Sequence, residues 1–176
     1  MSAEALPTAL DIRKVAQRGG DIRAVLNPSD LPRFRALLVG DQGRISARFR
    51  FSQDEESRHL ASVEIDAEVE VECQRCLEPM PRQLACRSEL AVVWTDEQAA
   101  ALPKHLEPLI VEDQFCDLMT VVEEELILAL PPFSYHDTER CSKLTRVFSD
   151  PVVEDEVEER RNPFDVLAQL KPGEKH

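Results

Sequence analysis

Two cysteines separated by two residues, Cys73 and Cys76, carry the clearest chemical signature in the chain. Thiolates at this spacing provide half of a tetrahedral site, and zinc is the metal that such sites usually hold. The other half would come from His136 and Cys141, which are separated by four residues. Three sulfur ligands and one nitrogen ligand form a donor set that suits zinc. The sequence therefore predicts a zinc site formed by these four residues.

Two other interpretations remain open for Cys73 and Cys76. A redox-active CxxC pair normally begins a helix, because the helix N-terminus lowers the pKa of the first thiol. Here Pro79 and Pro81 follow closely, and no α/β repeat precedes the pair, which argues against a thiol–disulfide oxidoreductase. In the third interpretation, the two cysteines are small buried residues at the end of a β-hairpin. The spacing alone does not decide between a metal site and a structural pair.

No catalytic constellation is evident elsewhere. The sequence lacks GxSxG, P-loop, GxGxxG and HExxH motifs. Glu123–Glu125 have the spacing of a solvated helix face, and no pair of carboxylates stands out as an acid and a base. Cys86 and Cys116 are predicted to lie in the core, where a free thiol packs like a small hydrophobe. The sequence therefore predicts a protein that is not an enzyme.

Three runs of alternating apolar and polar residues must position the cysteines. They span 44–51, 63–72 and 82–94, and each is predicted to be a half-buried strand. The second run places five carboxylates on one face, where like charges would repel. Arginines on the first run would offset that repulsion at roughly 0.2–1 kcal/mol per cross-strand pair. We therefore expect 44–51 and 63–72 to be antiparallel neighbours, with the CxxC pair in the connection to the third strand.

Charge is distributed unevenly along the chain. Residues 1–58 contain 10 Lys and Arg against 8 Asp and Glu, a net charge of +2, whereas residues 59–176 contain 11 against 26, a net charge of −15. The total of −13 disfavours a polybasic nucleic-acid binder. The facing charges either pair within the sheet or form a surface for a partner. The candidate partner-binding residues are Arg44, Arg48, Arg50, Glu64, Glu68 and Glu70.

The remaining elements complete an α+β fold, with helices packed on an antiparallel meander. Short strands are expected at 21–26 and around Leu109. Helices are expected where a capping residue precedes apolar residues at helical spacing. The expected helices are 11–19 with Asp11 as the cap, 29–38 with Ser29 as the cap, 95–102 with Thr95 as the cap, and 117–130 with Asp117 as the cap and Pro131 after its end.

The length of 176 residues fits one domain followed by a tail. We expect a single α+β domain over 1–148, an acidic linker over 149–161 and a short amphipathic segment over 162–176. No apolar run approaches the length of a membrane span, and the N-terminus lacks the pattern of a signal peptide. A cytoplasmic protein without structural disulfides is the expectation.

Six segments occur in a characteristic order: ECQRC at 72–76, TDEQAAALP at 95–103, LEPLIVED at 106–113, DLMTVVEEELILALP at 117–131, HDTERC at 136–141 and NPFDVLAQLK at 162–171. Together they resemble the YceD family, the large ribosomal RNA subunit accumulation proteins, and most closely its gamma-proteobacterial members. Distant members carry a richer cysteine cluster after the proline pair. A metal site in this chain would be limited to the four residues named above.

The resemblance implies a non-enzymatic role in the synthesis, processing or stability of 23S ribosomal RNA, and it supplies no catalytic residue. The implied partners are ribosomal proteins or a pre-50S assembly intermediate, with ribosomal RNA itself as a further partner. No membrane and no small-molecule substrate is implied. A zinc-stabilised protein-interaction module is the alternative function.

Overall fold

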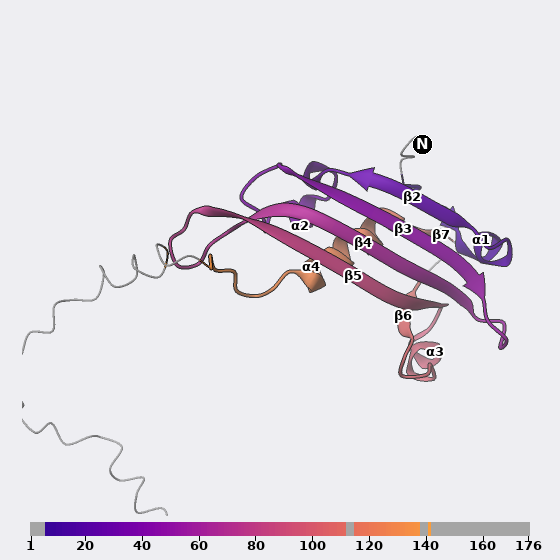
Figure 1. Ribbon diagram of the computed structural model, residues 1–176. Helices are drawn as coiled ribbons and strands as arrows, with labels where there is room; N and C mark the ends of the chain where they lie inside the picture. The colour runs from indigo at the N-terminus through magenta and orange to yellow at the C-terminus, as the bar shows by residue number, and fades with distance from the viewer. Residues whose placement is uncertain (1–5, 112–114, 138–140, 142–176) are drawn as a thin grey trace, which may run out of the picture.

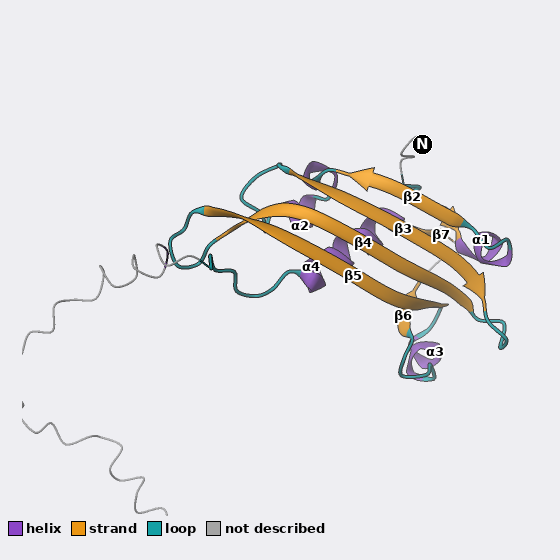
Figure 2. Ribbon diagram, in the orientation of Figure 1, coloured by secondary structure: helices purple, strands orange, loops and turns teal. Residues whose placement is uncertain are grey.

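A five-stranded sheet dominates the computed structural model, which describes residues 6–111, 115–137 and 141 (Figure 1). Its helices α2 and α4 lie behind one face, and no described element covers the opposite face, which we call the uncovered face (Figures 1 and 2). The strands follow the spatial order β2-β3-β4-β5-β6. Their bounds are Asp21–Leu26 for β2, Gly43–Gln53 for β3, His59–Glu72 for β4, Pro79–Val93 for β5 and Glu107–Ile110 for β6.

The register of the sheet confirms the predicted meander. β3 and β4 are antiparallel, and Arg44 lies opposite Glu68 while Arg48 lies opposite Glu64. β4 and β5 are also antiparallel. β6 runs parallel to β5, and the short helix α3 (Asp96–Ala100) lies in the connection. The apolar side chains of β3, β4 and β5 alternate into the core, so the polar ones share the uncovered face.

Helix α4 (Leu118–Ala129) packs against the apolar face of the sheet. Asp117 caps it by accepting a hydrogen bond from the Met119 amide, as the sequence predicts. Leu118, Val122 and Leu126 are fully buried along its inner side. β1 (Leu10–Asp11) and β7 (Phe115–Cys116) form a separate two-stranded sheet, and α1 (Ile12–Gln17) follows β1 directly in the chain. The predicted α+β class is confirmed.

The predicted helix over 29–38 is wrong in its extent. The structure has a 3₁₀ helix η1 (Pro28–Asp30) and one turn of α-helix α2 (Pro32–Arg35) instead. Proline lacks an amide proton and clashes with the preceding turn, so Pro32 begins a helix and cannot lie inside one. Ser29 lies within η1 and does not occupy the expected N-cap position. Phe34 is buried as expected, but Leu37 is half exposed.

Glu123 contradicts the expected solvated face of Glu123–Glu125. The residue is only 7% exposed, and its Oε1 accepts hydrogen bonds from the amides of Arg33 (2.6 Å) and Phe34 (3.1 Å). These amides begin α2 and have no partner within that helix. Glu123 therefore joins α4 to α2 by serving as the acceptor that the helix start lacks. Its neighbour Glu124 is exposed, as expected.

The expected linker over 149–161 and the amphipathic segment over 162–176 lie outside the described residues. Among the described helices, none combines the length and the apolar character that a bilayer span requires.

Candidate functional site

The turn between β4 and β5 forms the first half of the candidate metal centre. The Cys73 amide donates to the carbonyl of Glu78 at 3.0 Å, and the Leu77 amide donates to the carbonyl of Cys73 at 2.8 Å. Leu77 has φ of 59°, in the left-handed region that non-glycine residues seldom adopt. The result is a tight turn that points the Cys73 and Cys76 side chains to the same side.

The segment after α4 brings the second half of the centre to this turn. Pro131 and Pro132 prevent α4 from continuing, so the chain runs on in an extended form. The Gln74 backbone amide donates to the carbonyl of Ser134 at 3.0 Å, and the Gln74 side chain donates to the carbonyl of Pro132 at 3.3 Å. These two bonds fix the segment beside the turn and place His136 over the cysteines.

All four predicted ligands meet at this point. The ligand atoms of Cys73, Cys76, His136 and Cys141 lie within 4.8 Å of one another. The Cys73 and Cys141 sulfurs are 3.5 Å apart, and the Cys76 sulfur is 3.3 Å from His136 Nδ1. In a tetrahedral zinc site with Zn–S bonds of about 2.3 Å, neighbouring sulfurs are separated by about 3.8 Å. The side chains are thus close to the positions that a tetrahedral ion requires.

The electrostatics of the cluster also suit a cation. Burial raises the pKa of Cys73, but amide donors from Cys76, His136 and Arg75 outweigh it and lower that pKa to about 5. Burial and the two neighbouring thiols raise the pKa of Cys141 to about 11. One thiolate is therefore favoured without any ion, and a dication would offset the mutual repulsion of the others. The residues fit zinc by donor type, number and position.

The redox interpretation of Cys73 and Cys76 finds no helix here. The turn that carries both cysteines leads into β5, whereas a redox CxxC pair relies on a helix N-terminus to activate its first thiol. The Cys73 sulfur also lies 3.5 Å from the sulfur of Cys141, which comes from a distant part of the chain. This arrangement favours a shared ligand site over a dithiol pair.

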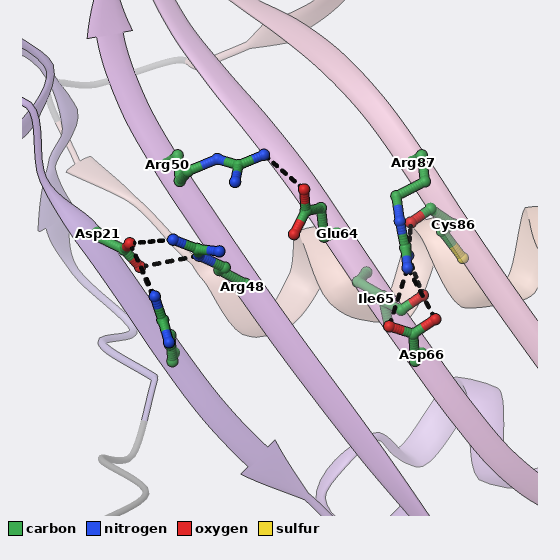
Figure 3. A network of polar contacts seen from close by, with 9 residues as sticks. Asp21, Arg48, Arg50, Glu64, Ile65, Asp66, Cys86 and Arg87 are labelled. Atoms are coloured by element: carbon green, nitrogen blue, oxygen red, sulfur yellow. Dashed lines mark hydrogen bonds and ion pairs between the residues drawn. The ribbon is translucent and has the colours of Figure 1, made fainter. Parts of the chain in front are cut away.

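The charged residues on the uncovered face form ion pairs at one end of the sheet (Figure 3). Arg48 donates to Asp21 at 2.6 Å, and Arg50 donates to Glu64 on the adjacent strand. Hydrogen bonds from Arg48 and Arg23 hold the pKa of Asp21 well below its usual range. Three of the candidate partner-binding residues, namely Arg48, Arg50 and Glu64, are therefore engaged within the sheet.

The pair of Arg87 and Asp66 is part of the same network and was missed from the sequence. Arg87 donates to both carboxylate oxygens of Asp66 at 2.9 Å, and it also donates to the carbonyl of Ile65 at 3.0 Å (Figure 3). Asp66 lies opposite Ala85, two positions from Arg87, so the contact is diagonal. The register of 63–72 against 82–94 would have suggested it.

The other end of the uncovered face is open. Arg44, Glu68 and Glu70 form no ion pair with any residue that the structure describes. Two hollows of about 470 and 430 Å³ adjoin them and share Glu68 and Gln83 as lining residues. We call these residues, Arg44, Glu68, Glu70 and Gln83, the open end of the sheet. They are available to a partner, whereas the paired end is neutralised internally.

The two core cysteines provide a check on the packing. Cys86 and Cys116 are buried as predicted, and burial raises the pKa of each thiol to about 11. At pH 8 both are therefore almost fully protonated, and their alkylation should be at least tenfold slower than that of a model thiol with pKa near 8.5. The rate should rise tenfold per pH unit up to the raised pKa. Iodoacetamide labelling read by peptide mass spectrometry measures this, and rapid labelling of Cys86 at pH 8 would contradict the packing.

Comparison with known proteins adds an independent result to this geometry. The family described as large ribosomal RNA subunit accumulation protein YceD matches residues 61–171, which is more than half of the chain. A protein of Haemophilus influenzae with the same name is 34% identical over 169 residues, covering 94% of this chain and 96% of that protein. No solved structure matches the chain. The chain belongs to the YceD family.

Proposed function

We propose that the protein is a non-enzymatic accessory factor in the accumulation of large-subunit, 23S ribosomal RNA. The observation that carries this proposal is the likeness to a protein of that name over nearly the full length of both chains. The chemistry of the site agrees, because its cysteines are arranged to hold an ion rather than to attack a substrate. This function implies a cytoplasmic location, where ribosomal subunits are assembled.

We propose that zinc, held by Cys73, Cys76, His136 and Cys141, is a structural component of the protein. The cluster ties the end of the β4–β5 hairpin to the segment that follows α4, two parts of the chain that are about 60 residues apart. A structural zinc ion contributes directly to the free energy of folding. The domain over 1–148, with the acidic linker and the amphipathic segment after it, remains our proposed organisation.

We propose that the protein acts by binding a ribosomal protein or an assembly intermediate, rather than by coating RNA. The open end carries two carboxylates, Glu68 and Glu70, beside Arg44, and Arg82 also lines one of its two hollows. The net charge of −13 favours encounter with basic proteins and disfavours contact with phosphates. Most ribosomal proteins are basic, so this surface suits them.

Affinity capture from lysate, run with and without RNase, tests this proposal. The bound material is analysed for large-subunit proteins by mass spectrometry and for ribosomal RNA by hybridisation. Basic large-subunit proteins should remain bound after RNase treatment. If every ribosomal component is lost with the RNA, the protein-binding proposal is wrong and the arginines of the N-terminal part become the site to mutate.

Charge reversal distinguishes the contribution of the open end to partner binding from the contribution of the overall net charge. The double variant Glu68→Lys, Glu70→Lys should weaken binding of basic large-subunit proteins by about tenfold, or about 1.4 kcal/mol, because two attractive contacts become repulsive. The matched control, Glu55→Lys with Glu107→Lys, changes the net charge equally at exposed positions away from the hollows. Binding is measured by titration at fixed ionic strength. Equal weakening in both variants would show that only the overall charge matters.

A further inference from the structure

Three exposed apolar side chains lie on the two segments that meet at the candidate metal centre. Leu77 is 69% exposed on the cysteine turn, and Phe133 and Tyr135 are 65% and 46% exposed on the segment after α4. The two aromatic residues flank Ser134, whose carbonyl accepts the Gln74 amide. The turn and the segment therefore lie side by side, and we call Leu77, Phe133 and Tyr135 the apolar rim.

The rim is held in place by polar contacts beneath it. The His136 amide donates to the Cys73 sulfur at 3.4 Å, so the residue after Tyr135 is anchored on the metal ligands themselves. The Arg75 guanidinium lies 5.1 Å from the centre of the Tyr135 ring, a cation–π contact between the turn and the segment. Exposed aromatic residues on a rigid, pre-organised support are typical of binding surfaces.

The backbone conformation of Leu77 is a further indication that the rim is a binding surface. Its left-handed backbone is a conformation that favours glycine and that residues with a leucine side chain seldom adopt. The side chain makes little contact with its own protein, because most of its surface is exposed. An exposed leucine that neither suits its backbone nor packs internally is consistent with a contact to another molecule.

Carboxylates flank the rim residues along both segments of the chain. Glu72, Glu78 and Asp137 are exposed and form no ion pair within the described part of the chain. Among the described residues of these two segments, Arg75 is the residue with a permanent positive charge, and it lies over the Tyr135 ring. An RNA strand stacking its bases on these aromatic rings would bring phosphates against three carboxylates. Positive charge around an apolar anchor is the complementary chemistry.

We propose that the apolar rim docks a basic protein segment that carries an apolar anchor side chain between Lys or Arg residues. The anchor contacts Leu77, Phe133 and Tyr135, and the flanking cations face Glu72, Glu78 and Asp137. The inference rests on the proposed function, since it supplies the contact surface for a large-subunit protein. It makes that contact dependent on the metal, because the ion joins the two segments that carry the rim.

The test uses full-length, zinc-loaded protein and RNA-free proteins extracted from purified large ribosomal subunits. The variants are Phe133→Ser and Leu77→Asn, the latter because asparagine tolerates the left-handed backbone. The main basic partner is first identified by mass spectrometry in the capture with wild-type protein. Each variant should bind that partner at least tenfold more weakly than the wild-type protein does. Phe115→Ser is the matched control, since Phe115 is 48% exposed on β7, at the other end of the molecule (Figure 1). It should bind within twofold of wild type.

Zinc content and the thermal midpoint are measured for every variant, and Tyr135→Ser provides a second reading if Phe133→Ser loses its zinc. Equal capture by wild type and rim variants overturns the inference and leaves the proposed function intact. The inference is also overturned if the wild-type protein binds a 12-nucleotide oligouridine tightly and only the rim variants lose that binding. It is likewise overturned if the wild-type protein forms a dimer and only the rim variants are monomeric. Failure of the wild-type protein to capture any large-subunit protein overturns both the inference and the protein-binding proposal.

Discussion

Cys76→Ser is expected to remove bound zinc and to lower the free energy of unfolding by roughly 3–5 kcal/mol, as the loss of a structural metal does. For a domain of this size, that loss corresponds to a fall in the thermal midpoint of about 10 °C. The physical reason is that one of four proposed ligands is lost, so the hairpin end and the segment after α4 are no longer joined through a metal ion and keep only their hydrogen bonds. Metal analysis of untagged protein and differential scanning calorimetry measure both effects.

Cys86→Ala is the matched control for this variant. Cys86 is buried in the sheet, its sulfur contacts the carbonyl of Glu125 at 3.5 Å, and it is not one of the four clustered residues of the candidate metal centre. The control should keep one zinc ion per chain and lose little stability, because alanine is only slightly smaller than cysteine. If the wild-type protein contains no zinc and chelation leaves its thermal midpoint unchanged, the cysteine cluster is a structural pair and the zinc proposal is wrong.

Glu123→Ala is expected to destabilise the protein by about 2–4 kcal/mol. The substitution leaves the amides of Arg33 and Phe34 without their acceptor at the start of α2, and each unsatisfied buried donor costs about 1–3 kcal/mol. Glu123→Gln keeps an acceptor oxygen and should lose less. Urea unfolding at constant pH measures the free energy of each variant.

Glu124→Ala is the control for this helix position. Glu124 is exposed, and its ion-pair partner among the described residues is the Arg33 guanidinium at 3.5 Å, so its removal should change the stability by less than about 0.5 kcal/mol. Equal losses in the Glu123 and Glu124 variants would show that the effect arises from helix charge and not from the buried acceptor.

The sheet could be predicted from the sequence because alternation of side chains specifies both a strand and its buried face. The five carboxylates on one face of β4 also led to the expectation of arginines on the neighbouring strand, and Arg48 does lie opposite Glu64. The helix over 29–38 could not be predicted correctly from apolar spacing alone, because Pro32 sets the helix start. Glu123 looked like a surface residue, since its acceptor role depends on amides 90 residues away in sequence.

The four ligands of the candidate metal centre could be predicted from residue type and spacing, because few residues bind zinc and His136 and Cys141 were the available second pair. The apolar rim could not be predicted. Phe133 and Tyr135 become part of one surface with Leu77 only when the proline-terminated end of α4 is placed beside the cysteine turn. The division of the charged face into a paired end and an open end likewise required the cross-strand register.

The ratio of 23S to 16S RNA in cells lacking the gene tests whether the protein acts in the accumulation of large-subunit ribosomal RNA. We predict that 23S RNA falls relative to 16S RNA, that a wild-type copy restores the ratio, and that Glu68→Lys with Glu70→Lys does not. Quantitative northern hybridisation at matched growth rate measures the ratio. An unchanged ratio in cells shown to lack the protein would contradict the proposed function.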